Sequence, residues 1–263
     1  MMDAMTPQNR PPRPVRTVTV LRTENVSPLM VRVIFAGDAL AEIGDLAYTD
    51  HYVKLKFGDV TRTYTIRWFD RDAQEMAIDF VVHGDEGIAG PWAASAKPGD
   101  EVSFVGPGGG WAPSPDADVH LLVGDESALP AIAAALDVLP ADARAEVFVE
   151  VASAAEHQPL AGGDNVAVRW IHRDERAMGY GEALTYAVQT ADFPAGRVEA
   201  FVHGNADMIK PLRHYLFNER EVPRDQVSIS GYWRTGLNED GWQSSKREFV
   251  EQMEAEQDGG VRV

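Results

Sequence analysis

Apolar and polar residues alternate along several short segments in the first hundred residues. Val53, Leu55 and Phe57 share one face of an extended chain, and Lys54 and Lys56 share the other. This period of two residues predicts half-buried β-strands, and turn-forming dipeptides separate the segments. The predicted strands cover residues 15–23, 30–35, 52–57, 61–67, 76–82 and 101–105.

One short helix interrupts this series of strands. Residues 84–90 are rich in glycine, and Pro91 takes the first position of a helix predicted over residues 91–96. Free backbone N–H groups at such a helix start can bind phosphate, although a plain connector has the same sequence features. His83 precedes the glycines, and we expect it to contact a cofactor.

The pattern changes after residues 106–115, which are rich in glycine and proline and mark a domain boundary. Beyond them, continuous apolar runs alternate with helical segments, and this alternation predicts buried parallel strands. The predicted strands cover residues 119–123, 147–151, 166–171, 198–203 and 227–230, and the predicted helices cover about 130–139, 181–189 and 206–217.

These two patterns predict an N-terminal antiparallel β-barrel followed by an α/β parallel-sheet domain. Six short strands with almost no helix are typical of a small barrel, and parallel sheets bind ligands at the carboxyl ends of their strands. We therefore divide the chain into a disordered leader at 1–14, a barrel at 15–111, a nucleotide-binding domain at 116–241 and a charged helical tail at 242–263. We expect the tail to be a surface helix, and packing on the site or forming a dimer contact stay open as alternatives.

Composition excludes several classes of function. The chain has 263 residues and no cysteine, which rules out disulfides, thiolate nucleophiles and cysteine-ligated iron–sulfur clusters within it. The net charge of −17 disfavours nucleic acid and anionic membranes as partners. Its seven histidines show no paired spacing, so we expect no metal site in the protein. The absence of cysteine fits the cytoplasm, where we expect the chain to act.

The predicted strand at 61–67 contains the sequence RTYTIR. Arg62 can give two parallel hydrogen bonds to a diphosphate, and Tyr64 lies on the same strand face, where its ring can stack on a planar ligand. Thr65 supplies a hydroxyl at the level of that ring. An ordinary amphipathic strand with a surface ion pair would have the same short pattern.

The turn at residues 124–130 lies where a dinucleotide would meet a helix start. Asp125 and Glu126 place negative charge where the pyrophosphate would approach, which disfavours very tight binding. Glu150 ends the next strand, where a carboxylate accepts a ribose hydroxyl and favours NADH. Arg169 and Arg173 can instead meet the 2′-phosphate of NADPH, so both donors remain open.

Five stretches in order resemble the siderophore-interacting protein family of FAD-dependent ferric-siderophore reductases. They are VKL at 53–55, RTYTIR at 62–67, DFVVHG at 79–84, GDESALPAI at 124–132 and GYWRTG at 231–236. The resemblance implies a fold like that of ferredoxin-NADP reductase, with FAD bound by the barrel and NADH or NADPH as electron donor. One departure is the run 87–92, GIAGPW, which lacks the serine that family members use for phosphate.

The resemblance also implies roles for individual residues. Lys54 and Arg234 match positions that are associated with the ferric substrate, and we add Arg67 as a third cation for an anionic chelate. Trp233 is interpreted as covering the flavin, although it can instead pack in the protein. The residues expected to bind FAD or the dinucleotide are Arg62, Thr63, Tyr64, Thr65, His83, Gly84, Gly90, Trp92, Ala93, Gly124, Asp125, Ser127, Ala128 and Trp233.

The implied chemistry is the reduction of a ferric siderophore, which releases Fe(II). A nicotinamide gives two electrons at once and Fe(III) accepts one, and a flavin links the two. No acid–base catalytic residue is needed for that transfer. Two alternatives stay open, a general NAD(P)H:flavin or quinone reductase and a non-catalytic protein that binds a flavin or a chelate. The sequence gives no oligomeric state.

Overall fold

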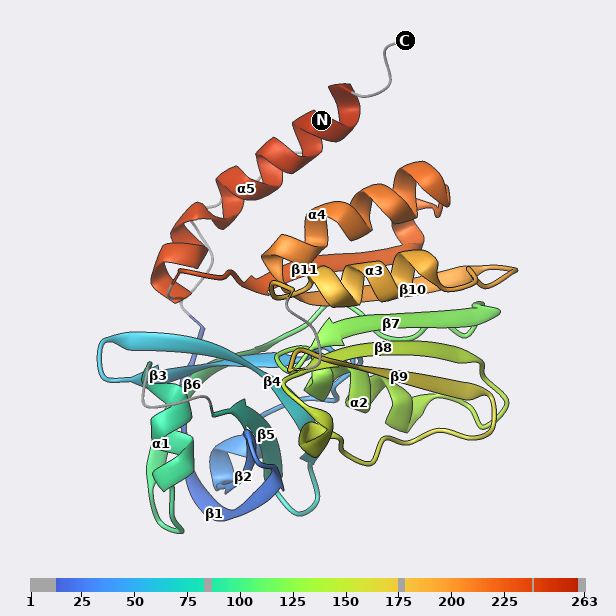
Figure 1. Ribbon diagram of the computed structural model, residues 1–263. Helices are drawn as coiled ribbons and strands as arrows, with labels where there is room; N and C mark the ends of the chain where they lie inside the picture. Colours follow the sequence, from blue (N-terminus) through green and yellow to red (C-terminus); the bar gives the residue numbers. More distant parts are fainter. Residues whose placement is uncertain (1–12, 83–86, 175–177, 238, 260–263) are drawn as a thin grey trace, which may run out of the picture.

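The N-terminal part of the protein is a closed antiparallel β-barrel (Figure 1). The computed structural model describes residues 13–82, 87–174, 178–237 and 239–259. The barrel strands pair in the order β1-β2-β5-β4-β3-β6, and β6 closes the barrel on β1. Their bounds are β1 Val15–Ser27, β2 Met30–Ala36, β3 Tyr52–Phe57, β4 Val60–Asp70, β5 Glu75–Val81 and β6 Glu101–Gly108.

A parallel sheet in the order β11-β10-β7-β8-β9 forms the second part. Its strands are β7 Val119–Asp125, β8 Ala145–Val151, β9 Val166–His172, β10 Val198–Asn205 and β11 Val227–Trp233. Every residue of β7 and β10 is buried, which explains why these central strands are continuous apolar runs in the sequence.

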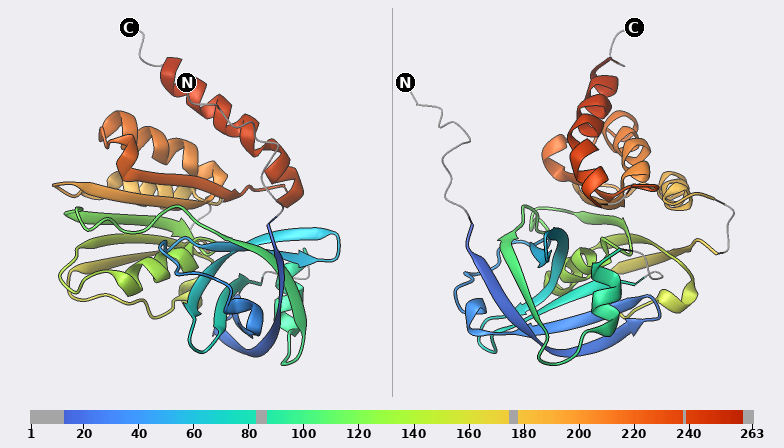
Figure 2. Two further views of the ribbon diagram at one scale, coloured as in Figure 1. Left: turned by 180° about the vertical axis from the view of Figure 1, so that it is seen from behind. Right: turned by 90° about the vertical axis from the view of Figure 1, so that its left-hand side faces the viewer.

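Helices cover both faces of this sheet (Figures 1 and 2). Helix α2, Leu129–Val138, packs on one face and against barrel strand β4. Helices α3, Glu182–Thr190, and α4, Ala206–His214, pack on the other face. Short helical turns occur at Asp38–Leu40, Ala154–Glu156, Tyr215–Glu219 and Arg224–Gln226.

The barrel and the sheet share a hydrophobic core. Met30 of β2 packs in the same cluster as α2 and the sheet, and the ring of Trp111 lies 4.6 Å from the ring of Phe201 in β10. The buried carboxylate of Glu156 accepts hydrogen bonds from Ser27 Oγ at 2.6 Å and from the Leu29 N–H at 3.0 Å. These contacts fix the carboxyl edge of the sheet next to the barrel.

The C-terminal helix α5, Glu239–Gly259, packs on the edge of the sheet that β11 forms (Figure 2). The side chain of Trp242 is 1% exposed, and Met253 and Phe249 join the core beneath α3 and α4. The expectation that this tail is only a surface helix is therefore wrong. Among the described helices, none is both long and apolar enough to cross a membrane.

The predicted fold class is confirmed, and the structure mainly lengthens the strands. Strand β4 runs to Asp70, three residues beyond the predicted end, and β11 runs on to Trp233. Both extensions carry aromatic residues, which are favoured in strands but break the simple alternation from which the ends were predicted.

Candidate functional site

Strand β4 brings the residues expected to bind FAD to the side of the barrel that faces the sheet. The guanidinium of Arg62 donates to the Thr61 carbonyl at 2.9 Å and forms a long, 3.4 Å ion pair with Asp240 of α5. The Tyr64 ring packs on Phe80, with 4.4 Å between the ring centroids. Asp240 is 71% exposed, so an incoming diphosphate can replace it at Arg62.

Thr65 links the barrel to the sheet. Its side chain is buried and lies within hydrogen-bonding reach of the Tyr232 hydroxyl in β11. Burial raises the pKa of the Tyr232 hydroxyl, and Asp50 and Asp125 raise it further. Tyr232 is therefore neutral at any physiological pH and acts as a fixed hydrogen-bonding group beside β4. Thr63, by contrast, is exposed.

Helix α1, Ala89–Ser95, packs close against β5 because Gly90 has no side chain. A Cβ at Gly90 would lie 3.1 Å from the Val81 carbonyl oxygen. Ala93 is buried in the barrel core, and the Trp92 ring contacts Phe35, Phe57 and Phe80. These contacts give Gly90, Trp92 and Ala93 a packing role, and their contact with FAD stays a prediction. His83 and Gly84 lie outside the described residues.

The turn between β7 and α2 is tightly built. A Cβ on Gly124 would lie 2.7 Å from the Ala128 Cβ and 2.8 Å from the His203 carbonyl oxygen, so only glycine fits. Ala128 is buried and takes the N-cap position of α2. Protein atoms therefore fill the inner side of the turn, and its contact with a pyrophosphate stays a prediction.

The carboxylate of Asp125 holds this turn together from inside. It accepts hydrogen bonds from the Ser127 N–H (2.9 Å), the Ser127 hydroxyl (2.5 Å), the Asn205 N–H (2.8 Å) and the Trp233 Nε1–H (2.8 Å). Burial, and then the neighbouring Glu126, raise the pKa of Asp125 to about 6. The expectation that this charge faces a pyrophosphate is wrong for Asp125, whose side chain is turned into the protein.

Glu126 and Glu150 are also engaged within the protein. Both carboxylate oxygens of Glu126 pair with the Arg173 guanidinium, one of them at 2.9 Å. Glu150, with a side chain 1% exposed, accepts the Gly181 and Leu184 N–H groups at 3.0 and 3.2 Å. Glu150 therefore caps the start of α3, and its interpretation as a ribose acceptor is wrong.

Trp233 follows Tyr232 on β11 and lies over the dinucleotide turn. Its indole meets the Tyr180 ring edge to face, with 5.2 Å between centroids, and Tyr180 in turn lies 4.6 Å below the Arg173 guanidinium. Trp233 thus packs in the protein and is also half-buried at the edge of the site. Its contact with the flavin stays a prediction.

Two lysines lie near each other on the other side of this site. The half-buried Lys246 in α5 donates from Nζ to Ser230 Oγ at 3.1 Å, and burial followed by the charge of Lys54 lowers the pKa of Lys246. Sequence reasoning missed Lys246. The only signal was the spacing of Trp242, Phe249 and Met253, which gives the tail an apolar face with Lys246 beside it.

The two arginines expected near the substrate lie in different surroundings. Arg234 pairs with Asp207 at 3.1 Å and lies 5.1 Å from the ring of Phe249 in α5, so it borders the same helix as Lys246. Arg67 instead pairs with Asp137 of α2 and is 13% exposed. Arg67 therefore joins the barrel to the sheet domain, and this geometry gives its predicted substrate role no support.

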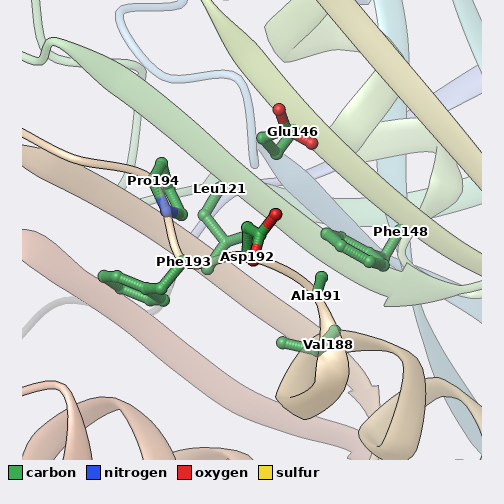
Figure 3. Close-up of a pocket in the computed structure, with 8 residues that line it drawn as sticks. All are labelled: Leu121, Glu146, Phe148, Val188, Ala191, Asp192, Phe193 and Pro194. Carbon is green, nitrogen blue, oxygen red and sulfur yellow. The ribbon is translucent and has the colours of Figure 1, made fainter.

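The small cavity in Figure 3 is not part of this site. Its volume is about 10 Å³, enough for one water molecule. It lies near the starts of β7 and β8, below the end of α3, away from the carboxyl edge of the sheet. The lining residues are Leu121, Glu146, Phe148, Val188, Ala191, Asp192, Phe193 and Pro194.

Comparison with known proteins identifies both parts of the chain. Residues 58–111 match the siderophore-interacting FAD-binding domain, and residues 117–236 match the siderophore-interacting protein model. The chain is 32% identical to the ferric vibriobactin reductase ViuB of Vibrio cholerae, over 73% of this chain and 71% of that protein. It is 30% identical to the NADPH-dependent ferric-chelate reductase of Escherichia coli, over 83% and 92%.

Solved structures agree with these matches. A siderophore utilization protein from T. fusca superposes with a TM-score of 0.79 at 35% identity, covering 88% of this chain and 97% of that one. The ferredoxin reductase of carbazole 1,9a-dioxygenase, at 16% identity and a TM-score of 0.64, shares the fold alone. The fold expected from the sequence resemblance is thereby confirmed.

Proposed function

Because this chain belongs to the siderophore-interacting protein family and contains its FAD-binding domain, we propose that it is a ferric-siderophore reductase. Its relatives include ferric reductases, which makes it an oxidoreductase. In the proposed reaction a nicotinamide dinucleotide loses a hydride, that is two electrons and one proton. Two ferric chelates that bind in succession each gain one of the electrons, and the proton is released to solvent. FAD supplies the change from paired to single electrons when it is bound.

One observation carries the proposal: two consecutive residues of β11 connect the two expected cofactor sites. Tyr232 lies beside Thr65 in the RTYTIR strand, and Trp233 donates a hydrogen bond to Asp125 in the turn at residues 124–130. The residues assigned to flavin and to nicotinamide thus meet at one strand end. An electron carrier held there lies next to its donor, as direct hydride transfer requires.

The residues on the barrel side fit FAD. Arg62 would hold the diphosphate, and Tyr64 would pack beside the ring system, with Thr63 and Thr65 at the same level. The close packing of α1 at Gly90 would keep backbone near the phosphates. On the sheet side, Gly124, Ser127 and Ala128 would form the dinucleotide turn, with Asp125 fixing its shape from inside.

The substrate would bind where β3, β11 and α5 meet. Ferric chelates with oxygen ligands are often anionic, and the protein carries a net charge of −17. Lys54, Lys246 and Arg234 would provide a local positive potential that attracts such a chelate. Fe(II) is bound more weakly by hard oxygen donors than Fe(III) and would dissociate after reduction.

Each part of the fold would bind a different ligand. The barrel segment 15–111 would hold FAD, segment 116–241 would hold the dinucleotide, and the tail from 242 would contribute Lys246 to the substrate side. We place the reaction in the cytoplasm, where the reduced dinucleotides are available.

The proposal is tested with purified protein under anaerobic conditions. We expect bound FAD, bleaching of its absorbance by a reduced dinucleotide, and reoxidation by a ferric siderophore with an Fe(II) trap present. Reoxidation by quinones alone would identify the general reductase instead. A protein that binds FAD but is bleached by neither NADH nor NADPH would be a non-catalytic binder.

A further inference from the structure

A charged cluster lies at the carboxyl ends of three neighbouring strands. Glu126 follows β7, Glu150 is the next-to-last residue of β8 and Arg173 follows β9, and these strands pair side by side. Arg173 binds both oxygens of Glu126 and has Glu150 at 3.6 Å. In sheets of this kind, the adenosine ribose of a dinucleotide lies at the end of the strand next to the pyrophosphate turn.

The charge of this cluster is unfavourable for a second phosphate. One guanidinium faces two carboxylates, so the three groups together carry a net charge of −1. Free NADPH differs from NADH by a 2′-phosphate of about −2, whereas NADH presents a neutral 2′-hydroxyl. A 2′-phosphate would have to displace Glu126 from Arg173 and would leave two carboxylates facing it.

The surroundings also hold Arg173 in place. The face of its guanidinium lies on the Tyr180 ring at 4.6 Å, and its side chain is 16% exposed. Arg169, the other arginine considered for a 2′-phosphate, is in the middle of β9. It pairs with Glu146 there and lies over Phe148, away from the carboxyl edge.

We infer that Glu126 determines which dinucleotide reduces this protein, because its carboxylate pairs with Arg173 and keeps that cation from a 2′-phosphate. The chain therefore uses NADH in preference to NADPH. The inference rests on the proposed function and specifies NADH as its electron donor. It differs from the relative in Escherichia coli that is named for dependence on NADPH. Glu126 is thus a specificity-determining residue, and Arg173 is a cation that becomes available to a 2′-phosphate only when Glu126 is removed.

The first test compares rates of flavin reduction by NADH and NADPH in the FAD-loaded protein. We expect the wild type to favour NADH at least tenfold in kcat/KM. The variant Glu126→Gln keeps the size of the side chain but releases the guanidinium, and it should lower this preference about tenfold, mainly by improving NADPH. Glu146→Gln, which breaks the equivalent pair at Arg169 far from the turn, should leave the preference unchanged.

A second variant works in the opposite direction. Arg173→Gln leaves both carboxylates without their cation, so it should raise the preference for NADH further and lose little of the rate with NADH. If the wild type prefers NADPH, or if neither Glu126→Gln nor Arg173→Gln changes the preference, the inference is overturned.

Binding of nucleotide fragments separates this inference from the proposed function. Titration calorimetry with 5′-AMP and with 2′,5′-ADP needs no flavin reduction. We expect the wild type to bind 5′-AMP more tightly and Glu126→Gln to gain affinity for 2′,5′-ADP. Glu126→Gln can gain affinity for 2′,5′-ADP even if neither dinucleotide reduces the flavin. In that case the reductase proposal fails, but the role of Glu126 and Arg173 in nucleotide selection stands. If the wild type and Glu126→Gln both bind the two fragments with equal affinity, that role is refuted.

Discussion

The indole Nε1–H of Trp233 donates a hydrogen bond to Oδ2 of Asp125 across 2.8 Å, joining the last residue of β11 to the last residue of β7. The two strands are not neighbours, because β10 lies between them. The bond therefore spans the middle of the carboxyl edge and fixes the turn at residues 124–130 against the end of β11.

Replacing the indole tests this bond. Trp233→Phe keeps an aromatic ring against Tyr180 but removes the donor to Asp125, so we expect a loss of stability of about 1 kcal/mol. Flavin reduction by the dinucleotide, measured per molecule of bound FAD, should slow several-fold. Trp170→Phe, on β9 against His157, serves as the control. Equal reduction rates in both variants would refute a role for Trp233 at the dinucleotide turn.

The raised pKa of Asp125 makes stability depend on pH. The folded protein holds this proton up to about pH 6, whereas the unfolded chain releases it near 3.8. Asp125 therefore favours folding less as the pH rises from 4 to 7, by about 2 kcal/mol over that range.

The variant Asp125→Asn isolates this effect from other titrating groups. It should be less stable than the wild type at pH 4, because the amide presents N–H groups to the N–H donors around it. The difference in unfolding free energy should shrink by about 2 kcal/mol between pH 4 and pH 7. Urea unfolding at both pH values measures this, and a constant difference would show that Asp125 has an ordinary pKa.

The docking of α5 depends on the absence of a side chain at Gly231. A Cβ there would lie 2.9 Å from the Trp242 ring and 2.9 Å from the Ala206 Cβ. Gly231→Ala should therefore push Trp242 out of its site and cost about 1–3 kcal/mol. Trypsin should then cleave faster after Lys246, a bond that the docked helix protects. Gly44→Ala, with no atom within 4 Å of the added Cβ, should show the wild-type pattern.

The strands and the expected cofactor segments follow from local sequence. The barrel alternates because each strand has one buried face, and β7 and β10 are apolar throughout because both of their faces are covered. Arg62 and Tyr64 could be placed on one strand because the period of two residues fixes which side chains share a face.

The partners of charged residues could not be predicted in this way. Glu150 and Arg169 lie in strand patterns that also fit nucleotide contacts. In the structure Glu150 accepts a hydrogen bond from the start of α3, and Arg169 forms an ion pair with Glu146. Asp137 binds Arg67 only because α2 packs across β4. These pairings depend on how helices dock on the sheet, which no short sequence pattern records.

Lys246 offers the sharpest test of the proposed substrate side. Its side chain is half-buried beside Ser230 and close enough to Lys54 for the two charges to repel each other, so a bound anion would relieve this repulsion. Lys246→Gln keeps a hydrogen-bond donor near Ser230 but removes the charge. We expect the KM for an anionic ferric siderophore to rise about tenfold, as the loss of one close charge pair of about 1.4 kcal/mol implies. Flavin reduction by the dinucleotide should stay at the wild-type rate.

The neighbouring Arg247 provides a matched control for this variant. Its side chain is 90% exposed and pairs with Glu251 on the outer face of α5. Arg247→Gln removes the same charge from the same helix, so it should leave the KM for the chelate unchanged. A neutral ferric chelate should be reduced equally well by the wild type and both variants, because the effect of Lys246 is electrostatic. If Arg247→Gln raises the KM as much as Lys246→Gln, the attraction comes from the overall charge of α5, and Lys246 has no specific part in binding the substrate.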